Sequence, residues 1–480
     1  MKVLRALSLT CAVLVAWLGV ASAQPAWYPL ATQPTFFPSQ VFLLTDGRVM
    51  VQAYESSNWY ALTPDINGSY LNGTWSQLAS TDANYAPLFY ASAILPDGRL
   101  IIQGGEYNIS GPAVFTTKGA VYDPYTNKWS AHSAPKGWKI VGDAQSVVLA
   151  DGKFLMASCC DDPSTAAFLE GATDKWTATG TGKADSYDEE AFTLLPGGKV
   201  LTVDTTIHKG SEIYDPTTGA WSSAGSLPVD VAEYVGDEIG PAVLRPDGTV
   251  IQFGATAHNA VYDTNTGTWS AAPDFPLNGS MQQLDVYDGP AALLPNGNVL
   301  VMTSPGQYMK GAQFFEWDGT NFNTEANTPN AANASSYFGR LLVLPTGGVL
   351  QTDYSKDIEI YFSTGDPDPS WEPVITEFKA KLHPGHTETL RGTQLTGLSE
   401  GGAFGDDFQD ATNYPLVRII NVSTNHVFYC RTHKFSSGVA TGSTIQSTDF
   451  DIPAGVETGP SYLQVVTNGI ASNSVDVTVE

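Results

Sequence analysis

The phrase LLPNGNVLV (293–301) decides the fold, because it occurs in seven related forms along the 480-residue chain. In each form apolar residues precede a turn such as Asp-Gly or Asn-Gly, and an apolar run follows it. Such pairs accept the positive φ of a tight turn, so each phrase predicts a β-hairpin. Successive turn glycines are separated by 51, 54, 46, 50, 49 and 50 residues: Gly47, Gly98, Gly152, Gly198, Gly248, Gly297 and Gly347.

A second phrase follows the first in several repeats. It reads YDPYTNKW (122–129), YDPTTGAW (214–221) and YDTNTGTW (262–269), and it predicts a second hairpin that ends in a packing tryptophan. Two hairpins in roughly fifty residues are typical of a four-stranded kelch blade. The sequence therefore predicts an all-β protein with a seven-bladed kelch-type β-propeller over residues 24–372.

A propeller must close, because its end blades would otherwise expose sheet edges. Trp27 lies ahead of the first complete hairpin, so we expect the N-terminal strand to complete the last blade. The period stops near the Pro-rich stretch GDPDPSWEP (365–373). Short alternating strands follow, which predicts an immunoglobulin-like (early-set) β-sandwich over residues 373–480.

Residues 1–23 have the pattern of a secretory signal peptide. Lys2 and Arg5 precede an apolar run, and Ala21-Ser22-Ala23 offers a cleavage site. No later segment stays apolar for the ~18 residues of a membrane span, so we expect a secreted protein. Six sequons are compatible with a glycoprotein, at Asn67, Asn72, Asn108, Asn278, Asn333 and Asn421.

The charge balance narrows the partners. The chain has 49 acidic against 23 basic residues, a net charge of −26. This charge argues against nucleic-acid phosphates and anionic membranes. It favours an extracellular saccharide or a small neutral or cationic ligand, bound by a monomer.

Three cysteines remain beyond the signal segment. Cys159 and Cys160 are adjacent, and Cys430 lies far along the chain. Three cysteines do not make a disulfide framework. A vicinal Cys159–Cys160 disulfide, a bridge from one of them to Cys430, and buried free thiols all remain open.

The signal segment, seven kelch-type blades and C-terminal sandwich together resemble the galactose oxidase family. The resemblance implies one copper near the propeller axis, bound by two tyrosines and two histidines. Tyr337 matches one tyrosine, and His433 in CRTHKF matches a histidine on a C-terminal hairpin that enters the ring. Phe338 stands where the family has a second histidine, so copper is disfavoured.

Two further family positions differ. Phe89 occupies the place of the cross-linked tyrosine, and Pro38 the place of the cysteine that it bonds. Tyr107 stands where the family has a covering tryptophan. At most two of the four copper ligands are thus present, which leaves a degenerate copper-radical oxidase only as an alternative.

Carboxylates occupy the corresponding positions in four consecutive blades. They lie nine to eleven residues before the hairpin glycines, at the predicted start of the inner strands. Because inner strands converge on the axis, we expect these groups to meet at one mouth of the channel, with Tyr90 and Tyr337 closing the other side. The carboxylates are Asp143, Asp188, Glu189, Asp237, Glu238 and Asp288.

Clustered carboxylates cannot all stay ionised without cost, so at least one pKa should rise. A protonated acid beside an ionised carboxylate is the pairing that cleaves glycosidic bonds. We therefore predict a carbohydrate-active protein with Glu189 and Glu238 as the acid/base pair. Tyr90, Tyr107, Tyr337 and Arg431 are the expected substrate contacts, Arg431 also compensating the acidic charge.

Three other interpretations of the carboxylates stay open. They could bond to backbone amides of neighbouring blades, or they could bind a structural Ca²⁺ ion through hard oxygen ligands. The chain could also be a non-catalytic saccharide- or protein-binding module.

Overall fold

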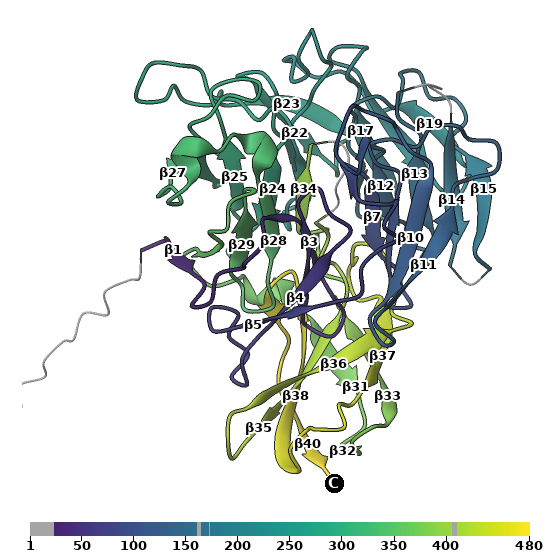
Figure 1. The fold of residues 1–480 in the computed structure, drawn as a ribbon, viewed down its shortest axis with the longest axis vertical. Helices are drawn as coiled ribbons and strands as arrows, with labels where there is room; N and C mark the ends of the chain where they lie inside the picture. The colour runs from purple at the N-terminus through teal and green to yellow at the C-terminus, as the bar shows by residue number, and fades with distance from the viewer. Residues whose placement is uncertain (1–23, 161–164, 172, 406–409) are drawn as a thin grey trace, which may run out of the picture.

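The protein is described here by a computed structural model, which covers residues 24–160, 165–171, 173–405 and 410–480. The predicted signal segment lies outside the described residues. Within them the fold is all-β: seven sheets form a seven-bladed propeller, and a second β-domain lies below it (Figure 1). The predicted fold class is thus confirmed. Three one-turn 3-10 helices are present, η1 (Ala331–Asn333), η2 (Ser336–Phe338) and η3 (Pro369–Trp371).

Each of the first six blades is built from the two predicted hairpins. The first hairpin supplies the two strands nearest the axis, and the second supplies the outer pair. From the axis outward the strands are β2 (Pro38–Leu43), β3 (Val49–Ala53), β4 (Trp59–Thr63) and β5 (Thr74–Gln77) in blade one; β7 (Ala91–Ile94), β8 (Leu100–Gln103), β10 (Lys118–Asp123) and β11 (Lys128–Ser133) in blade two; β12 (Ser146–Val148), β13 (Phe154–Ala157), β14 (Ala166–Glu170) and β15 (Lys175–Thr179) in blade three; β16 (Thr193–Leu194), β17 (Val200–Val203), β18 (Ser211–Asp215) and β19 (Ala220–Ser223) in blade four; β20 (Ala242–Leu244), β21 (Thr249–Gln252), β22 (Asn259–Asp263) and β23 (Thr268–Ala272) in blade five; and β24 (Pro290–Leu293), β25 (Val299–Thr303), β26 (Gln313–Trp317) and β27 (Phe322–Thr324) in blade six.

Two short strands stand apart from the blades. β6 (Pro87–Leu88) pairs with β9 (Tyr107–Asn108). The pairing joins the chain just before the inner strand of blade two to the loop between the second and third strands of that blade. It therefore ties two loops together at one end of the blade.

The N-terminal strand closes the ring, as the sequence predicted. Blade seven contains β28 (Arg340–Val343), β29 (Val349–Thr352) and β30 (Glu359–Phe362), and β1 (Ala26–Pro29) is its outer strand. β1 and β30 are antiparallel, with Trp27 opposite Tyr361. Trp27 packs against Phe314 of blade six at 4.8 Å between ring centroids. No sheet edge is left between the first and last blades.

The second domain is a nine-stranded sheet that curls into two layers. Residues 427–430 of its fifth strand pair with one layer, and residues 431–433 pair with the other. Its strands are β31 (Val374–Glu377), β32 (Lys381–Leu382), β33 (Thr387–Thr393), β35 (Leu416–Asn421), β36 (Val427–His433), β37 (Ile445–Asp451), β38 (Gly459–Thr467), β39 (Ile470–Ala471) and β40 (Val475–Val479).

The second domain packs on the hairpin-turn end of the propeller. The Thr432 amide donates to the Thr45 carbonyl at 3.1 Å, and the Phe435 amide donates to the Pro96 carbonyl at 3.1 Å. Gly47 has a φ of +80°, and a Cβ built on it would lie 2.5 Å from the Tyr429 ring. The turn therefore needs glycine both for its backbone and for the approach of the second domain. The opposite end of the inner strands faces away from this domain.

One strand from the C-terminal part of the chain enters the propeller. β34 (Gly402–Phe404) pairs with β24 on the axial side of blade six and lies among the inner strands (Figure 1). Phe404 lies under the Arg340 guanidinium, which is 4.0 Å from the ring centroid. The expected entry of a hairpin carrying His433 was wrong, because that residue lies in the β36–β37 ladder of the second domain.

We expect the closing strand to be anchored mainly by Trp27. Trp27→Ala removes the ring contacts and the hydrogen bond from Nε1 to the Ala326 carbonyl at 2.7 Å. The free energy of unfolding should fall by about 3 kcal/mol, measured by urea denaturation. Tyr28→Ala is the matched control, because its side chain points outward and is 46% exposed; it should cost less than about 1 kcal/mol. Equal losses would show that the strand and not its tryptophan closes the ring.

Candidate functional site

A cavity opens on the axis at the end of the propeller that faces away from the second domain. Its volume is about 60 Å³, and five of its residues carry carboxyl groups. A space of this size holds several water-sized groups. The lining residues are Phe89, Glu106, Tyr107, Asp143, Glu189, Glu238, Asp288, Tyr308 and Tyr337.

Six of the lining residues lie directly before an inner strand. Each stands two to four residues ahead of the inner strand of a different blade, from blade two to blade seven. The strands converge on the axis, so residues that precede them reach the same space. This set comprises Phe89, Asp143, Glu189, Glu238, Asp288 and Tyr337.

Three carboxylates form the centre of the cavity. Glu189, Glu238 and Asp288 each have an oxygen within 4.8 Å of the others. Glu238 is 8% exposed and Asp288 is 7% exposed. Oε2 of Glu238 is buried and has no hydrogen-bond partner among the described residues. This oxygen is available to a bound group.

Burial changes the protonation of this centre. Burial raises the pKa of Glu238 to about 7, and the charges of Glu106 and Glu233 raise it further, against a hydrogen bond with Asp288 that lowers it. Two carboxyl groups can share a hydrogen bond only if one of them holds a proton. Glu238 and Asp288 therefore share one proton near neutral pH.

The remaining polar wall consists of neutral phenols. Burial raises the pKa of Tyr107 to about 12. Burial also raises the pKa of Tyr308 and of Tyr337, and the charge of Asp288 adds to both effects. At neutral pH all three hydroxyls are hydrogen-bond donors and acceptors.

Aromatic rings enclose one side of the cavity. The Phe89 ring stacks on Tyr337 at 5.0 Å, and Tyr308 meets Tyr337 edge-on at 4.9 Å. Tyr107 lies 6.2 Å from Phe89. The cavity therefore has a carboxylate side and an aromatic side.

The backbone around the cavity is strained. Phe89, Glu189 and Asp288 have φ values of 52°, 54° and 38°, in the left-handed region that side-chain-bearing residues rarely occupy. Each such residue costs of order 1 kcal/mol or more, and such residues concentrate at functional sites. The surrounding blades hold these side chains in directions that a relaxed chain would not adopt.

Asp188, Asp237 and Tyr90 were expected at the site but do not line the cavity. Asp188 and Asp237 lie near each other, since the charge of Asp237 raises the pKa of Asp188 in addition to burial. Tyr90 is fully buried, and its hydroxyl donates to Oε1 of Gln52 at 2.6 Å. Tyr90 thus belongs to the packing between blades one and two.

Arg431 and His433 are not near the cavity. Arg431 forms an ion pair with Asp451 at 2.6 Å, and Nε2 of His433 lies 3.1 Å from the same carboxylate. All three side chains face a surface groove between the second domain and the turns of the propeller. The expectation that Arg431 compensates the axial carboxylates is therefore corrected.

Sequence reasoning missed Glu106 and Tyr308. Both lie in loops between the second and third strands of a blade, blade two for Glu106 and blade six for Tyr308. These loops reach the same end of the propeller as the starts of the inner strands. Because these loops reach the same end of the propeller, the segments after β8 and β25 could have been searched in the sequence for further polar site residues.

Of the open alternatives for the cysteines, the structure has the vicinal disulfide. Cys159 and Cys160 form a vicinal disulfide, and Cys430 is a buried free thiol. Sγ of Cys159 lies 2.6 Å from Oδ1 of Asp143. The disulfide therefore lies directly behind one cavity carboxylate.

The residues present do not fit copper. The chain has seven histidines, all within the described residues, and none lines the cavity. A copper(II) centre prefers imidazole nitrogens in tetragonal geometry, whereas the donors here are carboxylates and phenols. The carboxylate oxygens of Glu189, Glu238 and Asp288 are of the kind that Ca²⁺ accepts.

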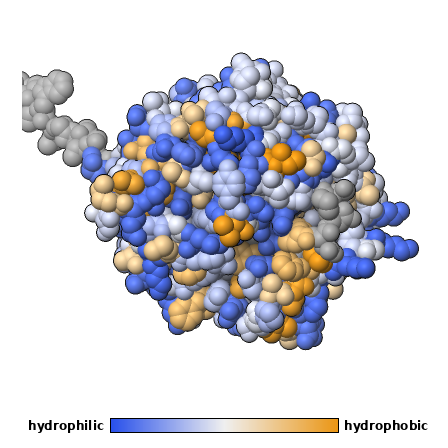
Figure 2. Space-filling model, turned by 90° about the horizontal axis from the view of Figure 1, so that it is seen from above, coloured by the Kyte–Doolittle hydropathy of each residue, from blue (hydrophilic) through white to orange (hydrophobic). Residues whose placement is uncertain are grey.

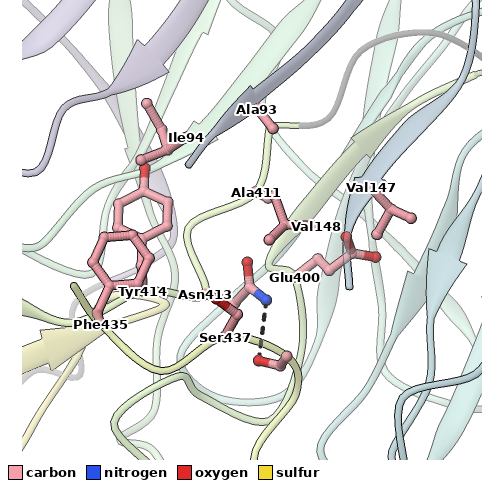
Figure 3. Close-up of a pocket in the computed structure, with 11 residues that line it drawn as sticks. Ala93, Ile94, Val147, Val148, Glu400, Ala411, Asn413, Tyr414, Phe435 and Ser437 are labelled. Carbon is pink, nitrogen blue, oxygen red and sulfur yellow. Dashed lines mark hydrogen bonds between the residues drawn. The ribbon is translucent and has the colours of Figure 1, made fainter. Parts of the chain in front are cut away.

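A second, smaller cavity lies farther along the channel, between blades two and three and the C-terminal chain (Figure 3). Its volume is about 20 Å³, which is room for one or two water molecules. Glu400 is its one ionisable residue other than Tyr414, and Oε2 of Glu400 accepts from the Leu194 amide at 2.8 Å. This cavity is too small for a substrate.

The raised pKa of Glu238 predicts a pH-dependent stability. A carboxyl group whose pKa is higher in the folded state stabilises the fold below its ordinary pKa of 4.5, and this contribution is lost as the pH rises through about 7. The loss amounts to about 3 kcal/mol. Glu238→Gln should remove this part of the decrease in unfolding free energy between about pH 5 and pH 8.

Urea denaturation at several pH values measures the effect. Other buried carboxyl groups, such as Asp285 and Glu400 with pKa values of about 7, also make the unfolding free energy depend on pH. They do so equally in the wild type and in Glu238→Gln. The difference between the two plots of unfolding free energy against pH therefore reports the contribution of Glu238. Glu377→Gln, an exposed change in the second domain, is the control. Parallel curves for wild type and Glu238→Gln would contradict a protonated Glu238.

Comparisons with known proteins support the fold and no closer relation. No protein-family model matches the chain, and no curated protein is similar to it in sequence. Among solved structures, a fungal alcohol oxidase of the AA5 family in complex with copper is similar, with a TM-score of 0.55, 14% identity, and coverage of 95% of this chain and 100% of that chain. The extracellular domain of a hybrid two-component system of B. thetaiotaomicron gives a TM-score of 0.47 and 11% identity, over 96% of this chain and 59% of that chain. At such identities the similarity concerns the architecture alone.

Proposed function

We propose that the protein is a secreted carbohydrate-active enzyme whose axial cavity cleaves a glycosidic bond by acid/base chemistry. One observation carries the proposal. A buried carboxyl group with a pKa near 7, that of Glu238, lies within 4.8 Å of the carboxylates of Glu189 and Asp288. A raised acid beside an ionised partner is the arrangement that glycoside cleavage requires.

The roles follow from the protonation states. The acid proton that Glu238 shares with Asp288 passes to the glycosidic oxygen as the bond to the anomeric carbon breaks. The carboxylate of Glu189 attacks the anomeric carbon to form a glycosyl ester. Water then hydrolyses this ester, and the Glu238–Asp288 pair takes up a proton from the water. Asp288 shares a hydrogen bond with Glu238 and orients it.

The spacing of the carboxylates bears on the stereochemistry. Inverting enzymes need about 6.5–9.5 Å between the two groups, to admit a water molecule, and retaining enzymes need about 5–5.5 Å. The oxygens of Glu189 and Glu238 lie within 4.8 Å. An oxygen–oxygen separation below 4.8 Å is closer to the spacing of retaining enzymes than to that of inverting ones, so we assign the pair the retaining course.

The aromatic side of the cavity suits a sugar ring. The hydroxyls of Tyr107, Tyr308 and Tyr337 match sugar hydroxyls, and Phe89 offers an apolar ring face. No basic side chain is required for these contacts. Asp143 also lines the cavity, as a further hydrogen-bond acceptor.

The proposal includes the organisation of the chain. Residues 1–23 are removed on secretion, residues 24–372 form the kelch-type propeller, and residues 373–480 form the immunoglobulin-like domain of a monomer. No helix among the described residues has the length and hydropathy needed to span a membrane. Glycosylation at Asn421 is not proposed, because that side chain is buried and its Nδ2 donates to the Thr458 carbonyl.

Substitution of the acid and the carboxylate tests the mechanism. Glu238→Gln and Glu189→Gln should each lower kcat on a cleaved oligosaccharide by about 10²–10⁴-fold, measured by release of reducing ends. Activity of the wild type should fall as the pH rises above about 7, because Glu238 then loses its proton. Asp247→Asn is the control, since Asp247 lies in the hairpin turn of the same blade and Asn preserves its bonds to Thr249.

Two outcomes would contradict the proposal. Wild-type rates in both glutamine variants would exclude acid/base catalysis by this pair. Ligands on a glycan array without any product after prolonged incubation would instead identify a non-catalytic binding module.

A further inference from the structure

A groove lies between the second domain and the hairpin turns of the propeller. Its volume is about 600 Å³, within the range of about 300–1,000 Å³ that ligand sites occupy, and such sites are frequent at junctions between domains. The turn between β10 and β11 contributes to one wall, and β33, β36 and β37 contribute to the other. The axial cavity opens on the opposite face, where apolar atoms lie in small groups among hydrophilic ones (Figure 2). A ligand in the groove therefore does not reach the axial carboxylates.

Tyr125 offers the groove an aromatic ring that the fold does not require. It lies in the turn YDPYTNKW of blade two and is 75% exposed. The same position of the turn is Thr217 in blade four and Asn265 in blade five, so the turn forms without an aromatic residue. An amphipathic ring exposed in this way is suited to the apolar face of a sugar.

The protein holds this ring in place from one side. The Arg431 guanidinium lies 5.1 Å from the centroid of the Tyr125 ring, within the range of a cation–π interaction. The Tyr125 amide donates to Oδ1 of Asp123 at 2.9 Å, which fixes the backbone of the turn. A ligand that covers the exposed part of the ring therefore loses less free energy to ordering it.

Asp451 orients the polar side chains of the opposite wall. Its Oδ2 accepts two hydrogen bonds from Arg431, at 2.9 and 2.6 Å. Its Oδ1 accepts from the Thr387 hydroxyl at 2.6 Å and lies 3.1 Å from Nε2 of His433. Burial raises the pKa of Asp451, but these hydrogen bonds outweigh it and lower that pKa below its ordinary value. The carboxylate is thus ionised and satisfied by protein donors.

The polar atoms that remain include both donors and acceptors. Nη1 of Arg431 is a donor with no hydrogen-bond partner among the described residues. Because Asp451 only accepts, Nε2 of His433 carries a proton, and Nδ1 of the neutral ring is an acceptor. The Thr387 oxygen also keeps lone pairs. Sugar hydroxyls donate and accept, so they match this set, whereas a carboxylate or phosphate ligand only accepts.

The fixed charges that line the groove are paired. Arg431 forms its ion pair with Asp451, and Asp46 forms one with Arg48 at 2.6 Å. The chain as a whole has a net charge of −26, which repels an approaching polyanion. The groove therefore favours a neutral ligand.

We propose that this groove binds a neutral oligosaccharide, with the apolar face of one sugar on Tyr125 and sugar hydroxyls on Arg431, His433 and Thr387. The two carboxyl groups that line the groove are held in ion pairs, so the site anchors a glycan and does not cleave it. It is separate from the axial cavity and does not depend on catalysis there.

An array of neutral glycans, followed by calorimetric titration with a bound glycan, tests the proposal. At least one neutral glycan should bind the wild type, and Tyr125→Ala should weaken its binding by about tenfold. Tyr462→Ala is the matched control, because Tyr462 is 41% exposed on the second domain and does not line the groove. The control should bind as the wild type does.

A second variant tests the polar wall. Arg431→Lys keeps the positive charge but loses the planar guanidinium that bonds Asp451 and the ligand at once, so it should also weaken binding by about tenfold. The affinity of the neutral glycan should be nearly independent of salt, since the ligand has no charge to screen. A thermal melt verifies the fold of each variant, and Tyr125→Ala, which removes an exposed ring, keeps the test decisive if Arg431→Lys unfolds.

The outcomes separate this inference from the proposed function. The inference would be overturned if no neutral glycan bound the wild type, if Tyr125→Ala kept full affinity, or if hexagalacturonate bound more tightly than the neutral glycans. Loss of glycan binding in Glu238→Gln but not in Tyr125→Ala would place the ligand in the axial cavity, which overturns the groove and leaves the proposed catalysis intact. Binding that depends on Tyr125 without any cleavage would support the groove and contradict the catalytic proposal.

Discussion

Convergence of the inner strands on one axis is the constraint on which the site depends. Residues that precede these strands in blades three to six are brought together from positions up to 145 residues apart, as Asp143 and Asp288 are. The ring buries Glu238 and Asp288 in this space, so their charges are poorly screened. The centre responds by retaining a proton on the Glu238–Asp288 pair. The acidity of the site is thus a consequence of the fold acting on ordinary carboxyl groups.

The strand β34 supplies the base that keeps this space small. It lies beside β24, and Gly405 follows it so closely that a Cβ there would lie 2.5 Å from Oδ1 of Asp288. Arg340, fully buried, donates to Oε1 of Gln40 at 2.9 Å, and Gln40 donates to Asp410 at 3.0 Å. The second domain therefore contributes to the cavity by filling the channel beneath it.

The sequence predicted the features that local rules determine, and it did not predict the features that tertiary contacts determine. Asp-Gly and Asn-Gly turns repeat with a fixed period, so the blades and the offsets of Asp143, Glu189 and Glu238 could be predicted. β34 could not, because Gly402–Phe404 has neither the length nor the alternation of a strand. The pairing of His433 with Asp451 depends on the register of β36 against β37, which no short motif encodes.

The same architecture accommodates different chemistry because folding places few demands on the cavity positions. The hairpins are stabilised by their turns and by apolar residues within the strands, whereas Phe89, Glu189 and Asp288 precede the strands with strained backbones. Strained residues of this kind concentrate at functional sites. An AA5 alcohol oxidase of similar fold is in complex with copper, and this chain has carboxylates and rings at its axis. Function must therefore be inferred from these side chains, since the blades alone do not determine it.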